Sequence, residues 1–170
     1  YVHPLLQSKW LTANNYNKNA TAESILRLDR MIEFNKSLVK ALKKAGVTIV
    51  TGTDAGTSGV VWGFSLHDEM DLLVKAGMTT NEVLRSATCL PASWLKMSDK
   101  TGSIEAGKFA DLVLLDGNPL ADINNTRKIA GVFVNGRWLD KKKISSMLAD
   151  LAKRNSAAKD QWDWQKRNEY

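Results

Sequence analysis

Residues 47–59, "VTIVTGTDAGTSG", join a β-branched apolar run to a loop of small residues around a single acid, Asp54. The run "VTIV" has the length and composition of a buried strand. In parallel α/β folds, the loops that follow the carboxyl ends of the strands converge on one face and carry the chemistry. A carboxylate at that point can bind a metal, act as a general base or hold a cationic ligand. The alternative is an aspartate that only caps a turn or a helix.

Helical patterns flank this stretch on both sides. Before it, apolar residues recur at helical spacing between Thr21, a plausible helix start, and Gly46, a typical helix stop. After it, three shorter helical patterns follow at residues 65–77, 78–90 and 91–97. This alternation of helix, strand and helix is typical of a βα architecture with parallel strands.

The two ends of the chain have a different texture. Residues 1–20 are Asn-rich after a short apolar start, which predicts a strand end followed by a long loop. Residues 102–140 contain the strand pattern "ADLVLLD" and then two apolar runs joined by Asn-Gly, a strong hairpin signal. We therefore expect a small β module here, followed by a helix at residues 142–155 and a polar, Trp-containing end.

Composition excludes several classes of protein. The single cysteine, Cys89, rules out an internal disulfide and a Cys-based zinc cluster. No apolar run approaches the ~20 residues of a membrane helix, so we expect no membrane partner. The net charge of +6 is concentrated in residues 141–170, which carry eight Lys/Arg against four Asp/Glu. A basic tail can attract phosphates, but no basic–aromatic interleaving accompanies it, so nucleic acid is not an expected partner and remains a rival hypothesis.

The order of the motifs resembles a known family. In sequence these motifs are "GVTIVTGTDAGTSG", "LHDEMDLLVKAGMTTNEVLRSATCLPASWLKM", "GSIEAGKFADLVLLDGNPLADI" and "VFVNGRW". Together they resemble the C-terminal part of the metal-dependent amidohydrolase superfamily over about residues 40–140. The most similar branch contains imidazolonepropionases and Xaa-Pro- or Xaa-Lys/Arg-type dipeptidases.

The resemblance implies an α/β fold, namely the C-terminal part of a (β/α)8 TIM barrel plus part of a small β-sandwich domain. Residues 1–98 would be the last βα units of the barrel, with "VTIV" as its eighth strand. Residues 99–140 would belong to the composite β-sandwich. Residues 141–170 would form a C-terminal helix and a basic, Trp-containing tail.

The resemblance also implies the chemistry. Asp54 would be both a metal ligand and the catalytic group that takes the proton from the attacking water. The cofactor would be a divalent metal, usually zinc (Zn2+), as one or two ions. The reaction would be hydrolysis of a C–N bond in a small-molecule substrate, a dipeptide or a cyclic amide. Substrate-pocket candidates are Ser58, His3 and Trp62, the last because many relatives have His-Gly where this chain has Trp62–Gly63.

The family's other ligands are absent from this chain. They are a His-x-His pair, a carboxylated Lys or a Glu, and two further histidines, whereas this chain has only His3 and His67. Zinc needs about four donors. We therefore expect the last 170 residues of an enzyme of roughly 400. By itself this chain would be inactive and hold no stoichiometric zinc, and the parent enzyme is a possible homo-oligomer. The alternative is a truncated, non-catalytic chain with a structural or binding role only.

Overall fold

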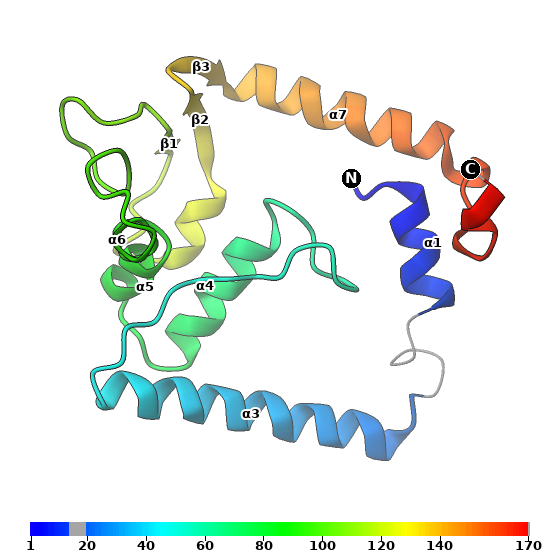
Figure 1. Cartoon of the computed structure of the whole chain (residues 1–170), viewed down its shortest axis with the longest axis horizontal. Helices are drawn as coiled ribbons and strands as arrows, with labels where there is room; N and C mark the ends of the chain where they lie inside the picture. Colours follow the sequence, from blue (N-terminus) through cyan, green and yellow to red (C-terminus); the bar gives the residue numbers. More distant parts are fainter. Residues whose placement is uncertain (14–19, 170) are drawn as a thin grey trace.

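The computed structural model describes residues 1–13 and 20–169, which contain helices and one antiparallel sheet. Helices α3, α7 and α1 lie along the periphery, and the segment after α3 crosses the middle of the molecule before it turns back into α4 (Figure 1). The elements are α1 (Pro4–Thr12), α3 (Ala22–Lys44), α4 (Ser65–Lys75), α5 (Thr80–Ser86), α6 (Cys89–Trp94), β1 (Leu112–Leu115), the 3-10 helix η1 (Ile123–Arg127), β2 (Ile129–Val134), β3 (Arg137–Asp140), α7 (Lys141–Ala157), and the 3-10 helices η2 (Lys159–Gln161) and η3 (Trp164–Glu169).

The sheet has the order β1-β2-β3, with antiparallel pairing throughout. The predicted hairpin is confirmed: β2 and β3 are joined by Asn135 and Gly136, both with positive φ, as a type I′ turn requires. Gly131 in β2 allows the Trp138 indole to lie across it, because a Cβ there would come within 2.1 Å of the indole Cη2. The described residues form one sheet, with no second sheet packed on it as a sandwich would have.

Local capping explains where the helices begin. Thr21 and Ser24 form a reciprocal capping box at the start of α3, and Thr79 and Glu82 form another at the start of α5. Glu82 also forms an ion pair with Lys43 of α3 at 2.7 Å. The Lys43 ammonium and the hydrogen bonds from Thr79 lower the pKa of Glu82 to about 2. This carboxylate therefore stays ionised down to acid pH and links α5 to the end of α3.

The prediction for the N-terminal residues is wrong. Instead of a strand end and a loop, residues 4–12 form α1. Pro4 fits the first helical turn, where no backbone donor is needed, and Nδ1 of His3 accepts a hydrogen bond from Leu5 N–H at 3.2 Å. The helix has no regular apolar stripe that would have revealed it. Residues 14–19 of the predicted loop lie outside the described part of the chain.

The predicted buried strand at residues 47–50 does not form. The segment has no strand pairing, and Val47 and Val50 are exposed while Ile49 is half-buried. A parallel strand needs a neighbour to receive its hydrogen bonds, and no such neighbour exists among the described residues. The prediction of a buried strand is therefore wrong for this chain.

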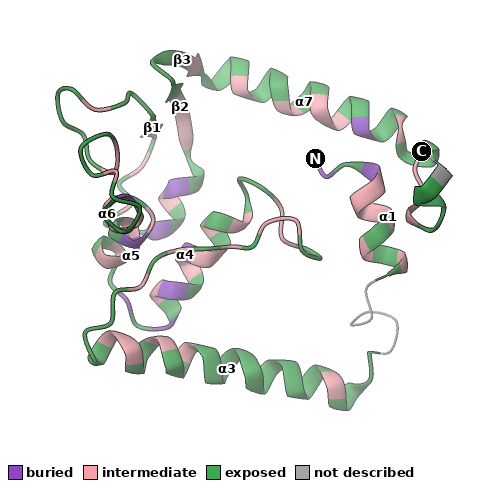
Figure 2. Ribbon diagram, in the orientation of Figure 1, coloured by how far each residue is buried: buried purple, intermediate pink, exposed green. Residues whose placement is uncertain are grey.

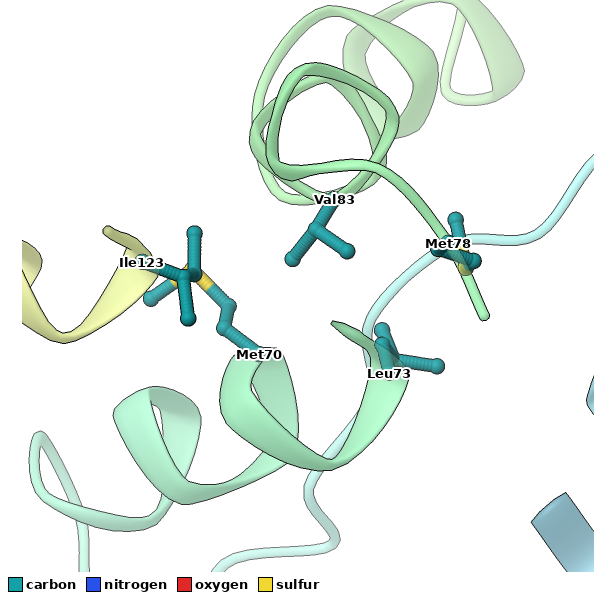
Figure 3. Close-up of a cluster of buried hydrophobic side chains, with 5 residues drawn as sticks. All are labelled: Met70, Leu73, Met78, Val83 and Ile123. Atoms are coloured by element: carbon teal, nitrogen blue, oxygen red, sulfur yellow. The ribbon is translucent and has the colours of Figure 1, made fainter. Parts of the chain in front are cut away.

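The core lies between α4, α5 and η1. Figure 3 shows its buried side chains converging from these elements and from the α4–α5 connection. Val39 of α3 and Ile49 of the extended segment pack against this cluster from outside. The cluster consists of Met70, Leu73, Met78, Val83 and Ile123.

Much of the apolar surface is left uncovered. The solvent-accessible surface is 12161 Å², whereas a compact monomer of this mass exposes about 8,300 Å² by the scaling of surface with mass. Helix α3 has no buried residue, although Ile25, Leu28 and Ile32 follow the predicted stripe (Figure 2). A helix with an apolar face normally buries that face against another element. Among the described residues, no helix is long and apolar enough to cross a membrane.

The C-terminal tail folds back onto α1. The ring of Trp162 meets His3 edge-on, with centroids 5.1 Å apart. The Trp164 indole receives Lys9 of α1 and Arg167, whose charged groups lie 4.7 and 5.1 Å from the ring centre. Cation–π contacts of this kind stabilise by about 0.5–1 kcal/mol at exposed sites. The two chain ends are thereby held together (Figure 1).

His67 of α4 connects the helical part to η1. Its Nδ1 lies 2.9 Å from Thr126 Oγ1. Thr126 donates its hydroxyl proton to the Ile123 carbonyl, so the imidazole donates from Nδ1. Burial first, and then the Arg127 guanidinium, lower the pKa of His67 below 6.5, and the nearby Asp68 opposes them. The folded state therefore favours the neutral imidazole.

This shift predicts a pH-dependent stability. As pH falls below 6.5, the unfolded chain binds a proton on His67 before the folded chain does, so the free energy of unfolding decreases. Above that pH the contribution is fully present. We expect His67→Gln to flatten this part of the profile, measured by urea unfolding between about pH 5 and 8. Equal slopes for the variant and the parent protein would contradict the assignment.

The core predicts a second stability effect. Val83 is fully buried, so Val83→Ala should lower the free energy of unfolding by about 1–3 kcal/mol through lost burial and a residual cavity. The matched control is Val113→Ala on β1, where the side chain is 59% exposed and the change should stay under about 0.5 kcal/mol. Urea denaturation of both variants measures the difference. Similar losses would mean that the cluster is not the core.

Candidate functional site

The extended segment after α3 is fixed by hydrogen bonds before it reaches Asp54. Thr51 N–H donates to the Ser86 carbonyl at 3.0 Å, and the Thr51 hydroxyl donates to the same oxygen at 3.3 Å. Ser86 is fully buried at the end of α5. The strand-like backbone is thus attached to the core by a backbone contact that any sequence could make.

Glu69 of α4 makes the next attachment. Its Oε1 accepts a hydrogen bond from Gly52 N–H at 2.8 Å. Its Oε2 is buried and has no hydrogen-bond partner in the described part of the chain. Sequence reasoning missed this residue, although a signal existed: Glu69 lies on the same helix face as Leu66 and Leu73, three residues after one and four before the other. An acid within an apolar face indicates a carboxylate held by a specific donor.

Asp54 lies two residues after Gly52, at the tip of a tight turn. Its backbone has φ 48°, in the left-handed region that Asp tolerates better than most residues. Its carbonyl accepts a hydrogen bond from Thr57 N–H at 3.2 Å, and the side chain is exposed to solvent. Among the described residues, no hydrogen bond or ion pair engages the Asp54 carboxylate. The carboxylate therefore caps no helix here and is available to an external ligand.

Trp62 covers the loop that carries Asp54. The indole lies so close to Gly56 that a Cβ on Gly56 would come within 2.8 Å of the ring. On the other side of the loop, Trp10 of α1 donates from Nε1 to the Gly56 carbonyl at 3.4 Å. Two indoles therefore contact Gly56: Trp10, which precedes it in sequence, and Trp62, which follows it.

Two of the three predicted pocket residues meet at one cavity. His3 and Trp62 both line a cavity of about 530 Å³ between the N-terminal residues, the loop before α4 and helix α7. Ser58, the third, is exposed on the loop and does not line this cavity, and neither does Asp54. Only tertiary structure could reveal the α7 residues in the wall, because they lie far from the others in sequence.

A metal centre requires more ligands than these residues supply. In residues 1–13 and 20–169, no cluster of three or more His, Cys, Asp or Glu side chains is placed to hold a metal ion. The free Asp54 carboxylate fits the role of one ligand, since carboxylate oxygens bind zinc and other divalent cations. Four-coordinate zinc would need further donors. The described residues alone therefore do not constitute a metal site.

Comparison with known proteins gives the family. The sequence matches the Amidohydrolase family over residues 8–139. The chain belongs to this family.

Individual relatives match only with part of their own length. Ochratoxinase of Aspergillus niger is 32% identical over 102 residues, which are 59% of this chain and 20% of that protein. A protein of Bifidobacterium longum assigned as a prolidase is similar in structure, with a TM-score of 0.64, 29% identity, and coverage of 86% of this chain and 38% of that one. A Xaa-Pro dipeptidase solved with bound methionine has a TM-score of 0.61 and 28% identity, and the match covers 81% of this chain and 34% of that one. The chain thus spans between about a fifth and two fifths of these relatives.

The contact between Trp62 and Gly56 yields a test with a matched control. Gly56→Ala should displace the indole, because the new methyl group and the ring cannot occupy the same space. Gly59→Ala imposes a similar positive-φ strain but meets nothing within 4 Å. Both variants should lose about 1 kcal/mol of stability. Only Gly56→Ala should shift the Trp62 indole N–H resonance, assigned with Trp62→Phe; equal shifts in both variants would show that the ring does not lie on Gly56.

Proposed function

We propose that this chain is the C-terminal part of a metal-dependent hydrolase that cleaves C–N bonds. In this proposal residues 47–50, which are extended but unpaired in this chain, become the last strand of a (β/α)8 barrel when the rest of the barrel supplies their neighbours, within a barrel portion that spans residues 1–98. Residues 99–140 are the β-sandwich portion, and residues 141–170 are the C-terminal helix and tail. The partial coverage of relatives and the exposed apolar face of α3 support the proposal, because the missing barrel units would cover that face.

The observation that carries the proposal is the free carboxylate of Asp54 at the end of an anchored, extended segment. In barrel enzymes, groups at the carboxyl ends of strands carry the chemistry. Asp54 accepts the proton of the attacking water and delivers it to the leaving amine, as a general base and then a general acid. Because no other described group bonds its oxygens, both remain available for this transfer.

A divalent metal, in this proposal Zn2+ as one or two ions, lowers the pKa of the attacking water when it is bound. Asp54 supplies one ligand, and the other ligands come from residues outside this chain. Two side chains contribute positioning: Glu69 of α4 holds the backbone at Gly52 by a hydrogen bond, and the Trp62 indole packs on it at Gly56. These contacts limit how far the Asp54 carboxylate can move.

The substrate is a dipeptide or a cyclic amide. The relatives named as prolidase and Xaa-Pro dipeptidase favour the dipeptide. The ochratoxinase relative shows that the branch is not restricted to proteins named as dipeptidases. We further propose that the parent enzyme forms a homo-oligomer. The proposal includes neither a membrane nor a nucleic acid as a partner.

A non-catalytic chain is the second candidate. Its support is that the described residues contain no cluster of His, Cys, Asp or Glu side chains placed to hold a metal ion. Such a chain would serve only a structural or binding role, and hydrolysis would not depend on Asp54.

Asp54→Asn in the full-length protein separates the two candidates. We expect kcat to fall by about 10²–10⁴-fold because the proton acceptor is lost, and the bound metal to decrease. The fold should be retained, since the carboxylate makes no internal hydrogen bond that the change would break. Asp99→Asn, a change of the same kind at an exposed site, is the control. The measurements are dipeptide turnover, metal content and thermal unfolding. If Asp54→Asn leaves turnover unchanged, Asp54 has no role in the mechanism.

A further inference from the structure

The cavity between residues 1–3, the loop at residues 61–64 and helix α7 has a composition that identifies its ligand. We infer that it binds the apolar, carboxylate-bearing part of the substrate, with the Arg154 guanidinium pairing with the carboxylate. The inference rests on the proposed function and deepens it, because it requires a substrate that carries a carboxylate. It concerns residues of this chain alone and a group other than Asp54.

Contacts within the chain hold the cavity open in advance. Asn155 of α7, only 8% exposed, donates from Nδ2 to the Tyr1 carbonyl at 2.9 Å. The Tyr1 ring stacks on Phe64, with centroids 5.3 Å apart and an interplanar angle of 10°. Gln7 of α1 donates from Nε2 to the Val2 carbonyl at 2.6 Å. The three segments that form the walls are therefore joined to one another and to α1 without any ligand.

The lining is apolar apart from a few polar groups. Trp62, Leu148 and Leu151 contribute aromatic and aliphatic surface, and Arg154 contributes a guanidinium. The lining contains no Asp or Glu. Among the described residues, Arg154 forms no ion pair or side-chain hydrogen bond, even with Asp150 one helical turn earlier. Arg154 is exposed at the rim of this largely apolar cavity, so its guanidinium is open to an anion bound there, and a guanidinium matches a carboxylate with two parallel hydrogen bonds.

Size and position agree with this ligand. A volume of about 530 Å³ is within the range of pockets for small molecules. Trp62 lines this cavity and also covers Gly56, so a ligand against the indole lies beside the loop that carries Asp54. A dipeptide or an N-acyl amino acid has both an apolar group and a carboxylate. A cyclic amide without a carboxylate offers Arg154 only a neutral carbonyl oxygen, which is a weaker acceptor.

A binding experiment tests the inference in the full-length protein carrying Asp54→Asn, which by the proposed mechanism does not hydrolyse the probes. The probes are N-acetyl-phenylalanine and N-acetyl-phenylalaninamide, which differ only in the charge of the terminal group. Calorimetric titration should give a Kd at least about tenfold lower for the carboxylate. Arg154→Gln should abolish this preference, and Arg154→Lys should restore part of it. Lys153→Gln, the same loss of charge one residue away and outside the cavity lining, should leave the preference intact.

Two results would overturn the inference: equal Kd values for both probes when Arg154 is present, or a preference that survives Arg154→Gln. Its failure can be told apart from failure of the proposed function. If dipeptide turnover depends on Asp54 but KM does not change in Arg154→Gln, the hydrolase stands and the cavity assignment is wrong. If the carboxylate preference depends on Arg154 but Asp54→Asn leaves turnover unchanged, the cavity is a binding site and the proposed mechanism is wrong.

Discussion

The hydrogen bond from Gly52 N–H to the Glu69 carboxylate is the contact on which the position of Asp54 depends. A strand in a barrel is normally fixed by neighbours on both edges, but residues 47–53 have no strand partner in the described part of the chain. Their position is set instead by α4, through Glu69, and by α5, through the Ser86 carbonyl. Because α4 and α5 also enclose the core, the loop inherits its position from the most buried side chains of the molecule.

The sequence identified the elements whose ends are set by local chemistry. The α3 and α5 helices begin at Thr21 and Thr79 because each hydroxyl accepts a hydrogen bond from a backbone donor three residues later, and the hairpin forms because Asn135 and Gly136 accept positive φ. Helix α1 was missed because its start depends on the His3 ring rather than on a usual capping residue. The segment at residues 47–50 was apolar enough for a strand, yet pairing depends on neighbours that no local pattern contains.

The candidate site divides in the same way. Asp54 could be selected because it stands alone among small residues after an apolar run, and Trp62 because it departs from the His-Gly pair of the family that the sequence resembles. The cavity residues of α7 could not be predicted from the sequence. Arg154 and Asn155 are about a hundred residues away in sequence, and their helix has the pattern of an ordinary basic surface helix. Ser58 lies in the same loop, but it is exposed and does not line the cavity.

The left-handed backbone at Asp54 has a consequence for which acid can occupy this position. Asp54 has φ 48°, and aspartate is several-fold enriched in this left-handed region whereas glutamate is not. Backbone geometry and acid–base chemistry thus impose two separate requirements on one residue. Over evolution, exchange between the two acidic amino acids, frequent on protein surfaces, would be disfavoured at position 54 even before any reaction takes place.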